Sequence, residues 1–473
     1  MQFDSLSFLV FLAAVLAGYN ALRAWPARKN FLLVASCVFY AAWNPPFLLL
    51  LLGSATLDWW IAMRIEAAED ARARKAWVTA TLLVNLAVLG YFKYWGFVLD
   101  TLCALLARVG IVYSPPDLGI VLPIGISFYT FHSLSYCLDV YRRKIQPTRN
   151  WRDYALYVAF FPQLVAGPIV RWTQMRQQIE TPRSVSDDTF FLGLTLLVIG
   201  LFEKIVLADS VFAGSADRVF NTAANVGAAD AWVGMLAFSG QIFCDFAGYS
   251  TCALGVAAML GFRLPINFRS PYAAGGFADF WRRWHITLSS WLRDYLYIPL
   301  GGNRHGAWLT YRNLMLTMLI GGLWHGAAWT FVAWGGLHGL YLSIERFFRG
   351  RIGDAVAANR LLRFAYAGVT LLAVMYAWVW FRAADFGTGW ILTRQLVNLP
   401  ALWSGWHATT TTDRIAVAVF ALVVAAQAST RNIDLDEVVA RMPALLLGLL
   451  LAAMLVLIVL SPGDSHAFIY FQF

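Results

Sequence analysis

The sequence predicts an all-α protein that crosses a membrane many times, and three observations support this fold class. First, 60% of the 473 residues are hydrophobic and only 13% are charged, whereas a soluble domain has about 25% charged residues. Second, apolar stretches recur from one end of the sequence to the other, and the mean hydropathy is +0.61. Third, basic residues gather in the short polar loops that separate those stretches.

The apolar stretches define the candidate membrane spans, because a spanning helix needs about 20 mostly apolar residues. Several are shorter than that, so we expect about eleven true crossings with the rest re-entrant or interfacial. No long polar module interrupts them, which predicts one membrane domain over residues 1–473, and no cleavable signal is expected. The stretches are 7–23, 31–43, 47–63, 78–98, 118–138, 190–212, 231–260, 313–323, 327–344, 361–381, 390–400, 413–428 and 443–461.

Basic residues exceed acidic ones by 36 to 27, a net charge of +9. Because these residues flank apolar spans, we interpret them by the positive-inside rule, with the N-terminus on the periplasmic side. They favour contact with membrane lipid, and no nucleic-acid partner is expected. The basic positions are Arg23, Arg28, Lys29, Arg64, 141–144, 149–152, Arg346, Arg349 and Arg351.

Three segments do not fit simple spans, and one of them, residues 262–276, is predicted to be a polar loop. Residues 153–171 carry Pro162, Gly167 and Pro168 within an apolar run. A proline inside a helix costs ~3 kcal/mol, so we predict a broken helix whose backbone is satisfied by protein or by a water-filled cavity.

Residues 280–295 predict one short amphipathic helix at the membrane interface, with His285 at the boundary of its two faces. Its apolar stripe is Trp281, Trp284, Leu288, Trp291 and Tyr295, and its polar side is Arg282, Arg283, Ser289, Ser290, Arg293 and Asp294.

Two histidines in or beside apolar segments are the leading candidates for chemistry, because an ionisable residue at membrane depth is costly and marks a functional site by default. His325 lies in the sequence GGLWHG (321–326), where the glycines permit close approach of other groups. An imidazole suits a general base, but a packing histidine bonded between helices explains the residue equally well. His285 could orient a substrate, share the proton transfer or bond lipid headgroups.

Other polar residues within apolar runs are weaker candidates. Asp245 is the lone charge of the run 231–260; it could partner a histidine or arginine, line a cavity, or form an ion pair that fixes helix packing. His338 is expected to be a packing or supporting residue, because it lies about 220° around a helix from His325. His132 is interpreted as structural.

Several classes of site are not expected. The sequence has no HxxxH, HExxH or carboxylate cluster, so no metal site is predicted. It has no Walker A loop, no GxGxxG and no GxSxG, which argues against an ATP-driven transporter and a serine hydrolase. The five cysteines are scattered without a CxxC pair and are interpreted as small buried hydrophobes.

With these residues in view, the chain resembles the membrane-bound O-acyltransferase (MBOAT) family, and within it the bacterial branch of alginate O-acetyltransferase membrane subunits. The resemblance covers nearly the whole chain and is most specific at FWRRWHITLSSWLRDYLYIPLGGNR (280–304) and NLMLTMLIGGLWHG (313–326). The other segments that carry it are 31–43, 89–97, 122–142, 160–171, 200–209, 241–250, 261–272 and FIYFQF (468–473).

The resemblance implies a ring of tilted helices around a central tunnel, with re-entrant helices on the cytoplasmic side. It implies that His325 is the catalytic histidine and His285 the second signature histidine. The implied activity is an inner-membrane O-acetyltransferase that takes acetyl from cytoplasmic acetyl-CoA, a substrate rather than a bound cofactor. The acetyl group would serve O-acetylation of a periplasmic or secreted polysaccharide, with an alginate-like exopolysaccharide foremost and an SGNH-type periplasmic transferase as partner. His132 departs from the expected pattern.

The donor site is the least defined part of this expectation. Arg282, Arg283 and Arg293 could receive the phosphates of CoA, or could contact lipid phosphates; Asp245 and Trp324 are further candidates for substrate binding. Peptidoglycan, cellulose and teichoic acid remain alternative acceptors, and a transporter that uses the tunnel without catalysis is the alternative from another class.

Overall fold

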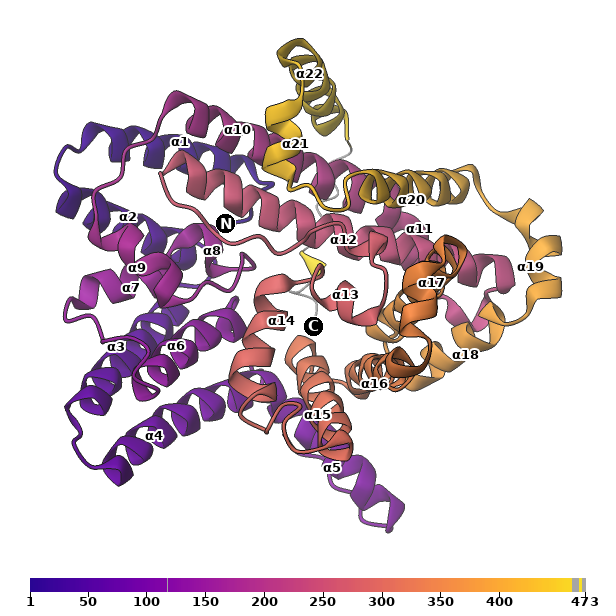
Figure 1. Cartoon of the computed structure of the whole chain (residues 1–473), viewed down its shortest axis with the longest axis horizontal. Helices are drawn as coiled ribbons and strands as arrows, with labels where there is room; N and C mark the ends of the chain where they lie inside the picture. Colours follow the sequence, from indigo (N-terminus) through magenta and orange to yellow (C-terminus); the bar gives the residue numbers. More distant parts are fainter. Residues whose placement is uncertain (117, 462–467, 470–473) are drawn as a thin grey trace. The chain divides into compact units, whose positions relative to one another are not determined.

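The computed structural model describes residues 1–116, 118–461 and 468–469, and within these ranges the chain is helical and has no β-strand (Figure 1). The predicted all-α class is confirmed. Six helical stretches in the described ranges are long and apolar enough to cross a membrane, so the chain is a multi-pass membrane protein; the number of about eleven crossings stays a prediction. The six are Pro45–Ala67, Ala71–Arg108, Asp187–Asn221, Ala228–Met259, Arg360–Arg382 and Thr411–Ser429.

The chain packs into two compact units, and one domain over residues 1–473 stays a prediction. The first unit comprises Met1–Phe190 and Val256–Leu264. Within it, α3 packs on α4, α6 and α7. Its helical elements are α1 (Leu6–Ala21), α2 (Trp25–Ala41), α3 (Pro45–Ala67), α4 (Ala71–Leu89), the π-helical η1 (Gly90–Tyr94), α5 (Trp95–Arg108), α6 (Ile126–Tyr141), α7 (Trp151–Ala159), α8 (Phe161–Leu164) and α9 (Trp172–Glu180).

The second unit comprises Phe191–Gly255 and Pro265–Phe473. Helix α10 begins in the first unit and α12 ends in it, but most residues of both helices belong to the second unit. The elements are α10 (Asp187–Leu201), the π-helical η2 (Phe202–Ala213), α11 (Gly214–Asn221), η3 (Ala223–Asn225), α12 (Ala228–Met259), η4 (Pro271–Ala273), α13 (Phe277–Trp281), α14 (Ile286–Leu292), the π-helical η5 (Arg293–Tyr297), α15 (Ala307–His325), α16 (Trp329–Ala358), α17 (Arg360–Arg382), α18 (Phe386–Leu396), α19 (Leu399–Gly405), η6 (Trp406–Ala408), α20 (Thr411–Ser429), α21 (Leu435–Arg441) and α22 (Ala444–Leu460).

The predicted break within 153–171 is confirmed. Helix α7 stops before Phe160, α8 lasts one turn with Pro162 near its start, and α9 begins only at Trp172. The freed backbone is satisfied by buried side chains: the Val170 N–H donates to His132 Nε2 at 3.2 Å, and the Tyr157 hydroxyl donates to the Val170 carbonyl at 2.9 Å. Protein groups therefore replace the missing helical bonds, as membrane depth requires.

The prediction of a span over 118–138 is wrong in its first third. The chain is non-helical up to Gly125, which adopts a left-handed conformation (φ 76°), and α6 begins only at Ile126. Pro123 explains the late start, because a proline lacks the N–H that an α-helix would use and constrains the residue before it.

The single amphipathic helix predicted over 280–295 is also wrong. Helix α13 ends at Trp281, α14 starts at Ile286 and η5 follows from Arg293. His285 separates the first two, because it adopts φ 42° and ψ 54°, a left-handed conformation that is uncommon for a residue with a Cβ atom. The predicted stripe is therefore interrupted: Trp284 is fully buried and Arg283 nearly so.

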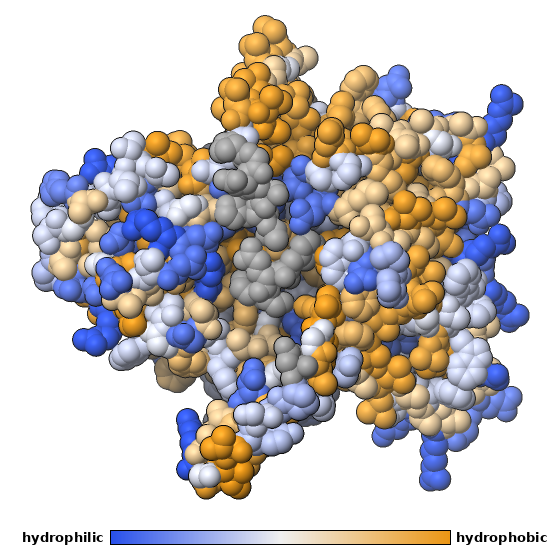
Figure 2. Space-filling view, turned by 180° about the vertical axis from the view of Figure 1, so that it is seen from behind, coloured by the Kyte–Doolittle hydropathy of each residue, from blue (hydrophilic) through white to orange (hydrophobic). Residues whose placement is uncertain are grey.

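Large apolar side chains cover broad areas of the surface in Figure 2, including the projecting helix α22. Leu445 and Val459 of α22 are 78% and 81% exposed, and Leu361 of α17 is 75% exposed. Exposed apolar area on this scale is expected of helices that face lipid.

Candidate active site

His325 is held at the end of α15 by close packing of α15 on α16. A Cβ atom at Gly322 would lie less than 3.0 Å from the Phe331 carbonyl oxygen, and one at Gly335 would be equally close to the Met318 carbonyl. Only glycine permits this backbone contact. Gly322, which precedes His325, and Gly335, which precedes His338, therefore allow α15 and α16 to pack closely where α15 ends at His325.

His285 is placed by the turn between α13 and α14. Its left-handed backbone conformation is sparsely populated outside glycine and persists only where the surroundings enforce it. The Ile286 N–H donates to the Asn267 carbonyl, and the Ser289 N–H donates to the His285 carbonyl, both at 2.9 Å. These bonds fix the turn and direct the imidazole inward, where it is fully buried.

The two histidines lie close together inside the second unit, as the functional reading of the sequence requires. Their ring centroids are 6.3 Å apart, and the Trp324 ring lies 5.9 Å from His285 and 5.0 Å from His325. Trp324 is buried and lies beside both histidine rings, so it forms part of the wall of this site. Residues 40 positions apart in sequence are thereby joined in one enclosure.

Aromatic rings form the rest of the enclosure. Phe246 of α12 meets the His285 ring edge-on at 4.7 Å, and Trp334 and Phe381 lie 5.0 and 5.4 Å from His325. Such walls exclude water and lower the local dielectric, which strengthens any polar interaction formed inside. The sequence did not predict Phe246, Trp334 or Phe381 as site residues, because aromatic residues occur throughout this chain.

His338 lies behind this pair. Its ring is 4.8 Å from Trp334 and 5.0 Å from Trp281, and it stacks on Phe280. It is fully buried, and neither of its ring nitrogens hydrogen-bonds within the described residues, so its role as a packing or supporting residue stays a prediction.

The electrostatic state of His285 follows from its burial. His285 lies outside the six candidate spans, and burial lowers its pKa to about 3. The imidazole is therefore neutral near pH 7 and offers one N–H donor and one nitrogen acceptor. Neither ring nitrogen hydrogen-bonds to the parts of the chain that the structure describes, so both are available to a polar group that enters the enclosure.

Asp245 lies one residue before Phe246 in α12. Its Oδ1 atom is 2.7 Å from the Nζ atom of Lys204 in η2, and its Oδ2 atom accepts the backbone N–H of Ile469 at 2.8 Å. Of the alternatives predicted for Asp245, the structure therefore contains the ion pair. The sequence could not identify these partners, because they are 41 and 224 residues away.

The three arginines predicted as donor ligands differ in their availability. The Arg283 side chain is 10% exposed; its Nε donates to Asp279 at 3.0 Å and its Nη2 to Asn432 at 3.0 Å. The Arg282 and Arg293 side chains are 66% and 63% exposed, and Arg293 pairs with Asp294 at 2.7 Å. Arg283 thus holds internal structure, whereas the side chains of Arg282 and Arg293 are largely exposed.

Asp279 is the centre of the network that holds Arg283. Burial alone would raise the pKa of Asp279, but the Gly275 N–H at 2.9 Å and the Arg431 and Arg283 guanidinium groups outweigh burial and hold it below its usual range. The network ties α13 to the loop after α20, so it positions the turn that carries His285.

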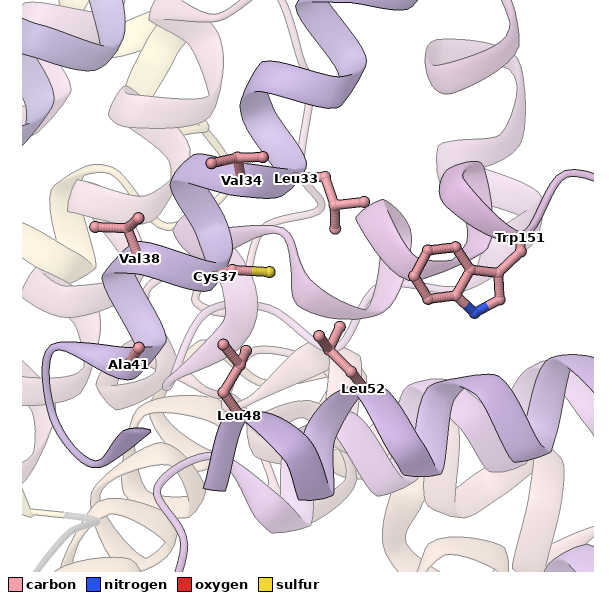
Figure 3. Close-up of a pocket in the computed structure, with 8 residues that line it drawn as sticks. All are labelled: Leu33, Val34, Cys37, Val38, Ala41, Leu48, Leu52 and Trp151. Carbon is pink, nitrogen blue, oxygen red and sulfur yellow. The ribbon is translucent and has the colours of Figure 1, made fainter. Parts of the chain in front are cut away.

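A separate apolar cavity lies in the first unit. It has a volume of about 330 Å³, and Figure 3 shows Cys37 and Trp151 among its lining residues. All its lining side chains belong to α2, α3 and Trp151 of α7, and none is a candidate site residue. It offers no acid, base or charged ligand and therefore carries no chemistry.

The enclosure of His285 and His325 can accept and move a proton and can orient a carbonyl or hydroxyl group. No group of three His, Cys, Asp or Glu side chains in the described ranges is arranged to hold a metal ion. The two imidazoles equip the site for acid–base and group-transfer chemistry.

Comparisons with known proteins agree with this chemistry. The model of the MBOAT, membrane-bound O-acyltransferase family matches residues 144–381. The probable alginate O-acetylase AlgI of Pseudomonas aeruginosa is 45% identical over 392 residues, covering 82% of this chain and 74% of that protein. The peptidoglycan O-acetyltransferase of Helicobacter pylori is 36% identical over 431 residues, covering 83% and 79%. The teichoic acid D-alanyltransferase of Bacillus subtilis is 26% identical over 252 residues, covering 50% and 62%.

Proposed function

Because the chain belongs to the membrane-bound O-acyltransferase family, we propose that it takes acetyl from cytoplasmic acetyl-CoA for O-acetylation of a polysaccharide outside the inner membrane. The chain is a multi-pass membrane O-acyltransferase. The observation that carries the finer proposal is the pair His285–His325, buried together in an aromatic enclosure. His338 is also buried among aromatic rings, but His285 and His325 are the two histidines whose rings face each other there.

The proposed final acceptor is an alginate-like exopolysaccharide. A separate SGNH-type periplasmic transferase passes the acetyl group on to it. Support comes from the relative named as a probable alginate O-acetylase, which is 45% identical to this chain. Peptidoglycan is the second candidate acceptor, because a relative named for that activity is 36% identical over 83% of the chain. Both acceptors are hydroxyl-bearing glycans and require the same bond changes.

In the proposed reaction, an acceptor hydroxyl oxygen attacks the thioester carbonyl carbon, an ester C–O bond forms and the C–S bond breaks. His325 takes the hydroxyl proton and then gives it to the departing sulfur, which leaves as the CoA thiol. General-base catalysis of this kind contributes about 10²–10⁴-fold to a rate. Neutral His285 donates its N–H to the carbonyl oxygen, where negative charge develops.

The exposed positive charges beside His285 suit an anionic acyl donor such as acetyl-CoA. Acetyl-CoA carries phosphates, and Arg recognises phosphate through its forked donors. Arg282 and Arg293 are the exposed cations of the His285 segment, so we assign them to the phosphates and assign Arg283 to the internal network. Charge reversal at both exposed positions should raise the KM for acetyl-CoA with little change in kcat.

The experiment uses a deletion strain complemented with the wild-type chain, His325→Ala or His407→Ala. His407 is exposed, so its removal is a matched control for loss of a histidine. Base-labile acetate is measured separately in purified exopolysaccharide and in peptidoglycan, together with the amount of membrane-inserted protein. We expect acetate to disappear from one fraction with His325→Ala and to remain with His407→Ala; full acetylation with His325→Ala would refute the proposal.

A further inference from the structure

A buried charge cluster joins η2 to α12 in the second unit. Lys204 Nζ lies 2.9 Å from Asp209 Oδ1 and 2.7 Å from Asp245 Oδ1, and all three side chains are at most 8% exposed. Burying an ion costs several kcal/mol unless it is well paired, and charges within spanning segments are rarely retained without a role. The proposed acyl transfer does not use this cluster, so its position needs a separate explanation.

Asp245 also binds the far end of the chain. Its Oδ2 atom accepts the Ile469 backbone N–H at 2.8 Å, and Phe468 and Ile469 are both buried. A carboxylate that accepts a backbone N–H forms a charge-assisted hydrogen bond, stronger than one between neutral groups. Asp245 thus binds Lys204 with one oxygen and the C-terminal residues with the other.

The docked residues lie against the wall of the candidate active site. The Phe468 ring is 5.9 Å from Phe246 and 4.8 Å from Tyr249, two residues of α12 that follow Asp245. Phe246 in turn meets the His285 ring edge-on at 4.7 Å. A continuous set of contacts therefore runs from Asp245 through Ile469, Phe468 and Phe246 to His285.

We propose that Asp245, held in place by Lys204, is a positioning residue that docks Phe468 and Ile469 on α12 and so fixes Phe246 against His285. The C-terminal residues then form part of the wall of the active site. This inference rests on the proposed function only in taking His285 as a residue of the reaction. It assigns to Asp245, the lone charge of residues 231–260, a role in the geometry of the site.

The competing explanation is that the cluster only packs η2 on α12. In that case Asp209 and Asp245 should be equivalent, because both bind the same Lys204 amine. The two aspartates differ in one respect that the structure makes plain: Asp245 also accepts the Ile469 N–H. This difference provides a matched pair of variants.

The first test is a double-mutant cycle between Asp245→Leu, which removes the acceptor at similar volume, and Ile469→Pro, which removes the donor N–H. Ile469→Ala, which keeps the N–H, controls for lost packing. Residues that act through one contact give non-additive effects. We expect each single variant to lower kcat about tenfold with KM for acetyl-CoA nearly unchanged, and the double variant to be no worse than the worse single variant.

The same cycle with Asp209→Leu in place of Asp245→Leu is the control, and there the effects should multiply. Multiplicative effects in the Asp245 cycle, or equal non-additivity in both cycles, would overturn the inference.

A second test does not depend on activity. Ile469→Cys is introduced into a chain with Cys37→Ser and Cys103→Ser, which removes the two partly exposed native thiols. Labelling by N-ethylmaleimide is then followed in purified protein, with the same chain lacking Ile469→Cys as baseline. We expect slow labelling that accelerates at least tenfold with Asp245→Leu and stays slow with Asp209→Leu.

Equal labelling with both aspartate variants would contradict the docking role even if acetyl transfer is confirmed. Selective acceleration with Asp245→Leu would uphold the docking even if the chain proved to transfer a different acyl group.

Discussion

His132 in the first unit and His285 in the second are both fully buried, yet their ring nitrogens meet different surroundings. His132 Nε2 accepts the Val170 N–H at 3.2 Å and so completes the broken segment between α8 and α9. His285 faces Phe246, Trp324 and His325, and neither of its nitrogens hydrogen-bonds within the described part of the chain.

Hydrogen bonding therefore distinguishes a structural histidine from a functional one at the same depth. A buried polar group without a partner loses its hydrogen bonds to water and gains nothing in return. Such a group is retained where a substrate or a water molecule supplies the missing hydrogen bond during function. The fold bonds one ring nitrogen of His132, whereas His285 is held in a strained turn and neither of its ring nitrogens is bonded within the described residues, which is the pattern of a preorganised site.

Among the tests of this comparison, we expect the largest effect when His285 is replaced and the catalytic rate is measured. His285→Ala should lower kcat about 10²–10³-fold, the usual loss when one donor to a developing oxyanion is removed. His285→Asn, which keeps an N–H donor, should recover part of that loss. The measurement is the rate of acetyl transfer per molecule of folded protein, and a His285→Ala variant with the wild-type rate would show that the open nitrogens have no role.

The next effect concerns the glycine contact that presents His325. Gly322→Ala places a Cβ atom against the Phe331 carbonyl, and overpacking of this kind costs about 1–3 kcal/mol. Gly368→Ala in α17 is the matched control, because nothing lies within 4 Å of its Cβ position. We expect lower thermal stability and lower kcat for Gly322→Ala only; equal behaviour of both variants would remove the role of the backbone contact.

His132→Ala should affect stability and leave the chemistry intact. It leaves the Val170 N–H buried without its acceptor, which costs about 1–3 kcal/mol. The midpoint of thermal unfolding in detergent should fall, while acetyl transfer per folded molecule stays near the wild-type value. A large loss of kcat at unchanged stability would place His132 in the site and contradict the comparison.

A further expected effect is a dependence of stability on pH. The pKa of His285 is lowered to about 3 by burial, so below its unfolded value of about 6.5 the unfolded chain binds a proton that the folded chain does not. Stability contributed by neutral His285 is complete above about pH 6.5 and falls by up to ~1.4 kcal/mol per pH unit toward pH 3.

Unfolding midpoints of wild type and His285→Gln, measured from pH 7.5 to 5 in detergent, test this. The wild type should lose more stability than the variant on acidification. Parallel curves would mean that folded His285 takes up protons as readily as the unfolded chain does.

Local chemistry explains which features could be predicted from the sequence. The all-α class follows from apolar runs of spanning length, and the break near Pro162 follows from the missing proline N–H. His285 and His325 were identified because ionisable residues are rare in apolar segments. Each of these signals lies within a few residues of the feature that it predicts.

The features that were missed depend on distant contacts. The left-handed turn at His285 interrupts an otherwise regular amphipathic pattern, and no glycine marks it. Arg283 was expected at a phosphate, but its carboxylate and amide partners include Asn432, 149 residues later. The partners of Asp245 are Lys204 and Ile469, which are far from it in sequence. No local sequence pattern could therefore predict its ion pair or its hydrogen bond to Ile469.

The most direct test of the central claim compares His325 with His132 in one assay. Membrane vesicles that contain wild type, His325→Ala or His132→Ala are supplied with radiolabelled acetyl-CoA, and label in envelope polymer is measured per amount of folded protein. The account predicts labelling by wild type and His132→Ala, and a loss of about 10²–10⁴-fold with His325→Ala. Labelling by His325→Ala at the wild-type rate would contradict it.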